Sequence, residues 1–175
     1  MHRIFFTVFS VSLVQGCAFE PPTVAVAPIL SGQMASGYTD PVNLPLAGTT
    51  SYAGEVEIDT PDLAAAGILE LEADFANDWV SGSISAFKDE FGQLHGYLEL
   101  SRGSICRCAD PNSEYAFDAS ISGTLSDMTR AFVVDGTLVG DFFGPDAKAV
   151  AGKLFGQITG SVGSTALSGT FLAFR

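Results

Sequence analysis

Alternation of apolar and polar residues is the dominant pattern of this chain after Gly48. Between Leu69 and Phe75, apolar residues occupy every second position, and glutamate or aspartate fills the positions between them. A period of two is that of a β-strand with one buried face. Comparable segments separated by turn residues predict eight strands, at residues 49–58, 69–75, 79–87, 94–105, 114–125, 130–142, 150–159 and 165–174.

The predicted strands are joined by short turns and recur about every sixteen residues, which favours an up-and-down arrangement. We therefore expect an all-β fold, an eight-stranded antiparallel up-and-down β-barrel, because closure leaves no exposed sheet edge. Glycines inside strands indicate close approach of bulky neighbours, and they recur at Gly54, Gly82, Gly96, Gly123, Gly136, Gly140, Gly152, Gly156 and Gly169. With 14 phenylalanines available to fill that space, we expect a filled core and no open ligand cavity.

The N-terminus has the layout of an export signal. Arg3 precedes an apolar run over residues 4–14, which is interrupted only by threonine and serine. A short positive end before about ten apolar residues is typical of a secretory signal peptide. The run is too short to span a bilayer, which needs about 20 residues. We assign residues 1–16 to a cleaved lipoprotein signal peptide.

The signal ends in Leu-Val-Gln-Gly followed by Cys17, which resembles the bacterial lipobox. That resemblance implies that Cys17 is acylated with chains such as palmitate and becomes the new N-terminus. Two or three acyl chains anchor a protein firmly to a membrane. Ala18 stands where aspartate is the usual inner-membrane retention mark, so we expect the outer membrane and leave the exposed leaflet open. The alternative is an ordinary signal peptide that ends near a cysteine.

Residues 17–47 are predicted to form a flexible tether, and residues 48–175 the barrel. Proline prevents regular strand pairing, and the tether contains Pro21, Pro22, Pro28, Pro41 and Pro45. Four aliphatic residues between positions 24 and 30 leave open whether part of the tether docks on the barrel.

Composition and charge exclude some functions. The 175 residues suit one domain with extensions. The formal net charge is −12, with only 8 lysines and arginines, so a nucleic-acid partner is excluded because phosphates require basic clusters. An anionic membrane surface repels such a domain, so the membrane attachment must be covalent or hydrophobic. The charge favours a basic partner or no partner at all.

Three segments resemble the β-barrel family of transferrin-binding protein B. Residues 140–152 (Gly-Asp-Phe-Phe-Gly-Pro-Asp-Ala-Lys-Ala-Val-Ala-Gly) resemble the family's signature hairpin. Residues 74–77 with Ser81 and Gly82 resemble its second-strand turn, and residues 168–175 its closing strand. The resemblance covers residues 48–175 and implies the barrel fold, a lipid anchor and a binding role in the envelope.

The chain also departs from that family. The family glutamate before Val150 is Ala149 here. The two-lobed receptors pair handle domains with barrels, whereas this chain has one barrel and no room for a handle. Single-barrel members include factor H-binding proteins and haemoglobin or haem receptors. Transferrin specificity does not carry over, because the matching residues are structural hairpin positions.

Cys106 and Cys108 are candidates for a disulfide in an oxidising envelope. Residues two apart on an extended strand lie about 6.6 Å apart, at the upper limit for such a bond. A bent backbone near Pro111 is therefore needed, and the sequence leaves the pairing open. We expect no metal and no cofactor, since two cysteines and His95 do not make a four-ligand zinc set.

Acidic residues gather on the first two predicted strands. We expect Glu55 and Glu57 to lie beside Glu70, Glu72 and Asp74, as a solvated outer face or as a patch for a cationic partner or a divalent ion. No serine-hydrolase elbow, metalloprotease or phosphate-loop motif occurs, so we do not expect an enzyme.

The leading hypothesis is a lipid-anchored binding protein that captures a host protein, an iron or haem source, or another extracellular ligand. The alternatives are a structural or accessory envelope lipoprotein without a soluble ligand, and a lipocalin-like carrier of a small molecule. A filled barrel leaves its outer wall and its rims for recognition, and loops on a rigid scaffold commonly carry binding residues. We choose Phe91, Arg107 and Tyr115 as candidate contact residues at one end of the barrel, because aromatics and arginine dominate interface energetics.

Overall fold

A computed structural model describes residues 37–109 and 114–175. The predicted signal peptide, Cys17 and residues 18–36 of the predicted tether lie outside the described residues. Within these ranges no helix is long and apolar enough to cross a bilayer. The elements are a short 3-10 helix η1 (Pro41–Asn43) and the strands β1 (Thr49–Asp59), β2 (Ala64–Asp74), β3 (Trp79–Asp89), β4 (Gly92–Gln93), β5 (His95–Ile105), β6 (Phe117–Ser126), β7 (Ala131–Phe143), β8 (Ala149–Gly160) and β9 (Gly163–Phe174).

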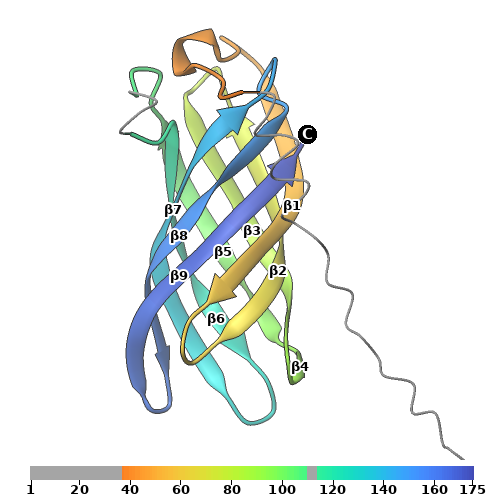
Figure 1. Cartoon of the computed structure of the whole chain (residues 1–175), viewed down its shortest axis with the longest axis vertical. Helices are drawn as coiled ribbons and strands as arrows, with labels where there is room; N and C mark the ends of the chain where they lie inside the picture. Colours follow the sequence, from red (N-terminus) through yellow and green to blue (C-terminus); the bar gives the residue numbers. More distant parts are fainter. Residues whose placement is uncertain (1–36, 110–113) are drawn as a thin grey trace, which may run out of the picture.

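The strands close into one antiparallel barrel (Figure 1). The sheet order is β2-β1-β9-β8-β7-β6-β5-β3-β4, and pairing between β2 and β3 completes the ring. The first and last strands, β1 and β9, are therefore neighbours. The predicted eight-stranded barrel is confirmed. β4 is an additional strand of two residues that pairs with the end of β3, and it is too short to leave an alternating pattern.

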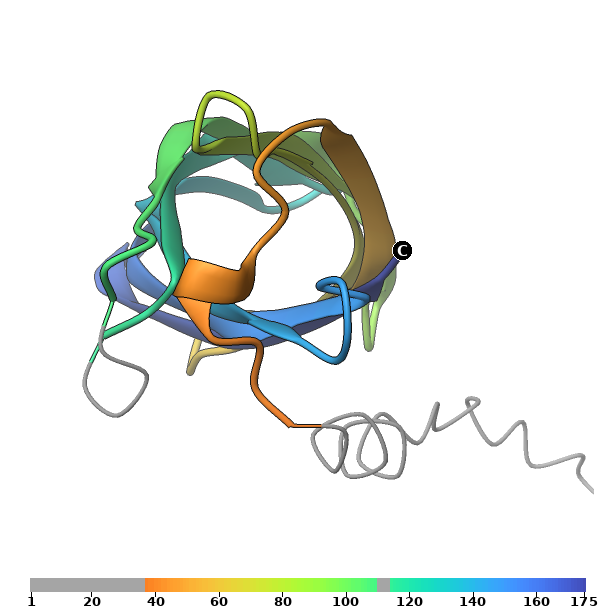
Figure 2. The same ribbon diagram turned by 90° about the horizontal axis from the view of Figure 1, so that it is seen from above.

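Side chains from opposite walls fill the barrel. Phe142 lies at the centre of an aromatic cluster, with ring centroids 5.0 Å from Phe117 and 5.5 Å from Phe75. A Cβ atom at Gly152 would lie 2.8 Å from the ring of Phe171, so that ring occupies the space which the glycine leaves free. The ribbon in Figure 2 encloses a region that these side chains occupy. The predicted filled core is confirmed for the described residues.

The two ends of the barrel differ in what covers them. We call upper the end that carries residues 37–48, the β2–β3, β5–β6 and β7–β8 loops and the C-terminus, as oriented in Figure 1. The lower end carries the β1–β2, β3–β5, β6–β7 and β8–β9 turns.

Residues 37–48 form a cap over the upper end (Figure 2). Thr39 N–H donates to the Phe142 carbonyl at 2.8 Å, and Leu44, only 2% exposed, joins the core. Residues 37–47, assigned to the tether from the sequence, are thus packed against the barrel. Tyr38 pairs with Phe143 in an isolated antiparallel bridge, and the prolines that follow it limit further pairing without preventing the turn around η1 from docking.

Candidate functional site

The outer wall carries a cleft of about 270 Å³ where β7, β8, β9 and β1 lie side by side. We call it the outer cleft. Its lining combines apolar, aromatic and charged side chains: Glu55, Glu57, Tyr115, Asp141, Phe143, Ala151, Gly152, Lys153, Thr170, Phe171 and Leu172. Apart from Tyr115, which lies in the β5–β6 loop, all of them belong to the four strands.

The floor of the outer cleft consists of outward-facing positions that are nevertheless buried. Ala151 on β8 and Leu172 on β9 are paired in register and only 5% and 6% exposed. Apolar residues also face outward elsewhere on the wall, but Ile68, Val133 and Phe155 are about half exposed. The burial of the apolar floor is what distinguishes the outer cleft from the rest of the wall. The sequence signal is a break in alternation, because apolar residues are consecutive from Phe171 to Ala173.

Carboxylates stand at the edges of the outer cleft. Asp141 is partly buried, and burial raises the pKa of its carboxyl, although the Ala116 N–H donates a hydrogen bond to it at 3.0 Å. Glu55 and Glu57 are exposed on β1. Within the described part of the chain, none of these three carboxylates forms an ion pair within 4.0 Å.

A second hollow, of about 560 Å³, lies on the outer wall over β1, β2 and β3. Glu70 and Glu72 line it together with serines of β3. The register places Glu55 opposite Ile68 and Glu57 opposite Ala66, so the glutamates of neighbouring strands are offset and not directly opposed. This offset reduces the repulsion that directly facing carboxylates would cause. The acidic face predicted from the sequence is therefore present, with its charges staggered.

The three predicted contact residues do not gather at one end of the barrel. Phe91 lies in the turn between β3 and β4 at the lower end and is 75% exposed. Arg107 lies at the upper end in the β5–β6 loop. Tyr115, 41% exposed, lines the outer cleft. The structure thus brings only Tyr115 to the candidate site.

Arg107 is held by groups of this chain. Its guanidinium donates to Asp78 Oδ1 at 2.6 Å and to the carbonyl oxygens of Leu44, Pro45 and Phe75 at 3.1, 2.7 and 2.8 Å. Hydrogen bonds from a charged donor are the stronger kind. These bonds fasten the cap to the upper end, which gives Arg107 a structural role that the sequence pattern did not indicate.

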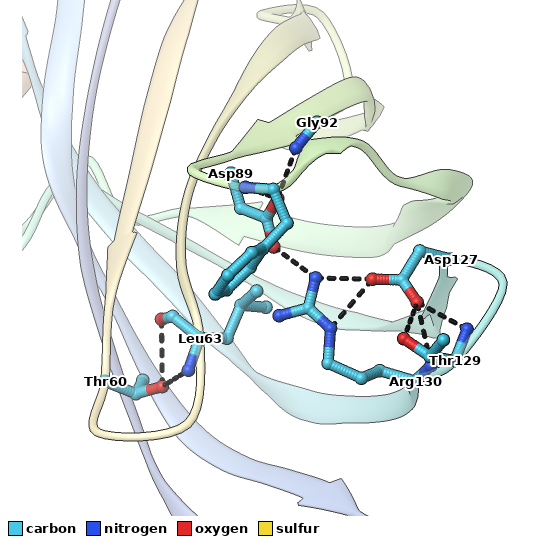
Figure 3. Close-up of polar contacts among 8 residues, drawn as sticks. Thr60, Leu63, Asp89, Gly92, Asp127, Thr129 and Arg130 are labelled. Atoms are coloured by element: carbon cyan, nitrogen blue, oxygen red, sulfur yellow. Dashed lines mark hydrogen bonds and ion pairs between the residues drawn. The ribbon is translucent and has the colours of Figure 1, made fainter.

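Phe91 belongs to a cluster around Arg130 at the lower end. Figure 3 shows the carboxylates of Asp89 and Asp127 bonded to the Arg130 guanidinium. Arg130 Nη2 lies 2.6 Å from Asp89 Oδ2, and the Asp89 side chain is only 3% exposed. Arg130 also pairs with Asp127. Hydrogen bonds from the Thr129 N–H and from Arg130 hold the pKa of Asp127 well below its usual range. The guanidinium lies 4.6 Å from the centre of the Phe91 ring, a cation–π contact.

Cys106 and Cys108 flank Arg107 and are free thiols in the structure. Their sulfurs lie 2.7 Å apart, and the hydrogen bond between the two thiols raises the pKa of Cys108. The disulfide between them stays a prediction. No group of three or more histidine, cysteine, aspartate or glutamate residues in the described ranges is placed to hold a metal ion.

Comparison with known proteins supports the fold. No family model matches the chain, and no curated protein matches it. Among solved structures, the chain is similar to a double mutant of the vaccine antigen transferrin-binding protein B from Haemophilus parasuis Hp5, with a TM-score of 0.50 and 16% identity. The barrel has a transferrin-binding protein B-like fold. The match covers 78% of this chain but only 27% of that chain, so this chain spans about a quarter of that antigen's length.

Proposed function

We propose that this chain is a lipid-anchored protein of the bacterial outer membrane that binds an extracellular protein through the outer wall of its barrel. Two features support the anchor: the signal-like residues 1–16 and the lipobox-like sequence before Cys17. The transferrin-binding protein B-like fold supports a binding role, because binding of transferrin is what the name of that antigen states. The proposal includes no catalytic step.

The observation that carries the binding role is the combination of a filled core with the outer cleft. Aromatic rings occupy the interior, which gives no support to a lipocalin-like carrier. The outer cleft has an apolar floor, and its carboxylates form no ion pair with any residue that the structure describes; a purely structural envelope lipoprotein requires neither feature. An accessory lipoprotein without a soluble ligand is the alternative that experiment must separate.

The anchor is tested by changing Cys17 to serine. We expect the variant to leave the membrane fraction and to lose labelling by a fatty-acid analogue, whereas Cys108→Ser keeps both. Density-gradient fractionation assigns the membrane, and protease treatment of intact cells reports which leaflet displays the barrel. Unchanged labelling of the Cys17 variant would contradict the lipoprotein assignment.

The binding role is tested by retention of protein ligands from growth medium and envelope extracts on the immobilised full chain, followed by mass spectrometry. We expect at least one extracellular protein to be retained reproducibly and released by salt, because the barrel is acidic. Failure to retain any protein under these conditions would favour the accessory role.

A further inference from the structure

Strand register places one carboxylate at each end of the floor of the outer cleft. Asp141 pairs with Ala151, Ala151 pairs with Leu172, and Leu172 pairs with Glu55, so the four residues form one row across β7, β8, β9 and β1. Adjacent strands lie 4.7–4.9 Å apart, so this row is about 14 Å long. Both middle positions are apolar and buried. The result is an apolar strip with one acidic residue at each end.

The charges around this strip are not balanced within the described chain. Glu57 extends the acidic edge in the next row, and Lys153 is the single basic residue among the lining residues. Asp141 is partly buried, yet the group that donates a hydrogen bond to it is the Ala116 N–H and not a cation. Placing a carboxylate beside apolar surface without a counter-ion is unfavourable, so a bound cation would relieve that cost.

Aromatic rings border the same strip. Tyr115 lines the outer cleft from the β5–β6 loop, and Phe143 lines it from the end of β7. Phe143 is braced by Tyr38 of the cap, with ring centroids 6.2 Å apart in an edge-on arrangement. Aromatic faces attract guanidinium and ammonium groups. Apolar floor, aromatic walls and acidic ends are together the complement of a long side chain with a charged tip.

The size and the surroundings of the outer cleft decide between a small molecule and a protein. Its volume of about 270 Å³ is below the range of roughly 300–1,000 Å³ that is usual for small-molecule sites, and it suits a single side chain. The acidic outer face continues from Glu55 onto Glu70 and Glu72 of β2. A wider acidic surface favours a partner that carries several positive charges.

We infer that the outer cleft binds an arginine or lysine side chain of a basic segment on a protein partner, with the stem on Ala151 and Leu172 and the charged tip at Asp141 or Glu55. This inference rests on the proposed binding function and names the chemistry of its partner.

The test uses the purified full chain labelled with ¹⁵N and three probes in NMR titrations. The probes are capped tetra-arginine, capped tetra-citrulline, which has nearly the same shape without the charge, and butylguanidinium. We expect tetra-arginine to shift the amide resonances of Ala151, Gly152 and Leu172 and to bind at least tenfold more tightly than either other probe. Equal binding of tetra-citrulline would overturn the charge requirement. Equal binding of butylguanidinium would overturn the assignment to a protein segment.

Matched variants locate the binding. Asp141→Asn and Glu55→Gln should each weaken tetra-arginine binding at least fivefold, whereas Glu99→Gln, an exposed glutamate on β5 in the opposite wall, should change it less than twofold. Ala151→Leu fills the floor without changing charge and should abolish the shifts, with circular dichroism reporting an intact barrel. Equal weakening by Glu99→Gln, or full affinity of Ala151→Leu, would overturn the inference.

Retention of a natural partner on the immobilised protein shows whether this inference or the proposed function has failed. If wild type and Ala151→Leu retain the same extracellular protein equally, the binding function stands and the inference about the outer cleft fails. If tetra-arginine binds in the outer cleft but no extracellular protein is retained, the chemistry of the cleft stands and the proposed function fails.

Discussion

At each end of the barrel one arginine holds the loops together by hydrogen bonds, but the two arginines bond different kinds of acceptor. At the upper end, Arg107 bonds three backbone carbonyls and one carboxylate, that of Asp78. At the lower end, Arg130 bonds two carboxylates, those of Asp89 and Asp127. Carbonyl groups do not titrate, whereas carboxylates do. The upper end, where three of the four acceptors are carbonyls, is therefore expected to be less sensitive to acid than the lower end.

The two arrangements also connect different parts of the chain. The upper arginine joins segments 29 to 63 residues away, among them the cap around Leu44. The lower arginine joins a local turn, three residues away, to Asp89 on the β3–β4 turn, 41 residues away. Loss of the upper arginine should thus free a whole covering segment, and loss of the lower one should loosen two turns.

The largest expected effect is on the upper end. Arg107→Ala leaves the carbonyls of Leu44, Pro45 and Phe75 without this donor, and we expect the free energy of unfolding to fall by about 3 kcal/mol. Chemical denaturation measures the loss, and protease cleavage within the cap should accelerate. The matched control is Arg102→Ala, which removes an exposed arginine that stacks on Trp79. A loss as large in the control would show that the carbonyl bonds are not the cause.

Acidification should act on the lower end. The pKa of Asp127 is lowered in the folded state, so its stabilising effect is complete above its unfolded pKa of about 3.9 and is lost as pH falls below that value. We expect the Tm of wild type to fall by several degrees more between pH 7 and pH 3 than that of Asp127→Asn.

Two further variants sharpen the acid experiment. Arg107→Ala should keep the pH dependence of wild type, although its Tm is lower at every pH. Asp62→Asn changes an exposed aspartate in another turn of the lower end and serves as the charge control. A flat pH response of wild type would contradict the assignment of acid sensitivity to the Arg130 cluster.

A smaller effect concerns the cysteines beside Arg107. In protein purified without reductant, we expect Cys106 and Cys108 to have lost two hydrogens together, measured by mass spectrometry after alkylation. Reduction should then lower the Tm by a few degrees, because the bond restrains the turn that presents Arg107. Free alkylation of both thiols in the native protein would show that the pair is not bonded.

The smallest effect is expected at Phe91. Phe91→Ala removes a largely exposed ring from Arg130, so the Tm should change by no more than about 2 °C. Tyr115→Ala, at the outer cleft, should in contrast weaken binding of a retained protein about tenfold, or 1.4 kcal/mol. Loss of binding in the Phe91 variant with full binding in the Tyr115 variant would place the contact surface at the lower end.

The fold was predictable because each strand of the barrel has a local sequence pattern, an alternation of apolar and polar residues bounded by turn residues. The alternation between Leu69 and Phe75 corresponds to β2, and the glycines that predicted close packing lie beside rings such as Phe171. The cap was not predictable. Pro41 and Pro45 give it the composition of a tether, whereas its docking depends on the burial of Pro41 and Leu44 and on hydrogen bonds from the distant Arg107.

The candidate site was less predictable, because it depends on register across four strands. Nothing local to Asp141 or Glu55 shows that both stand at the ends of one row. The residue type of Arg107 is common in interfaces, and this alone predicted a contact role. Its bonds to distant carbonyls follow only from the closed topology of the barrel. Tyr115 was predicted as a contact residue because aromatic residues are common in interfaces, and in the structure it lines the outer cleft.

The pairing of β1 with β9 restricts the order in which this chain can fold. Six of the eleven residues of β1, from Ala53 to Ile58, pair with β9, and the paired residues of β9 include Phe174. A chain that emerges from its N-terminus cannot complete the ring until its final strand is available, and contacts between such distant segments form slowly. Until then β1 has an open edge of the kind that pairs with other chains. Closure of this barrel is therefore expected late in folding, and a chain cut short before β9 should aggregate instead of forming a smaller barrel.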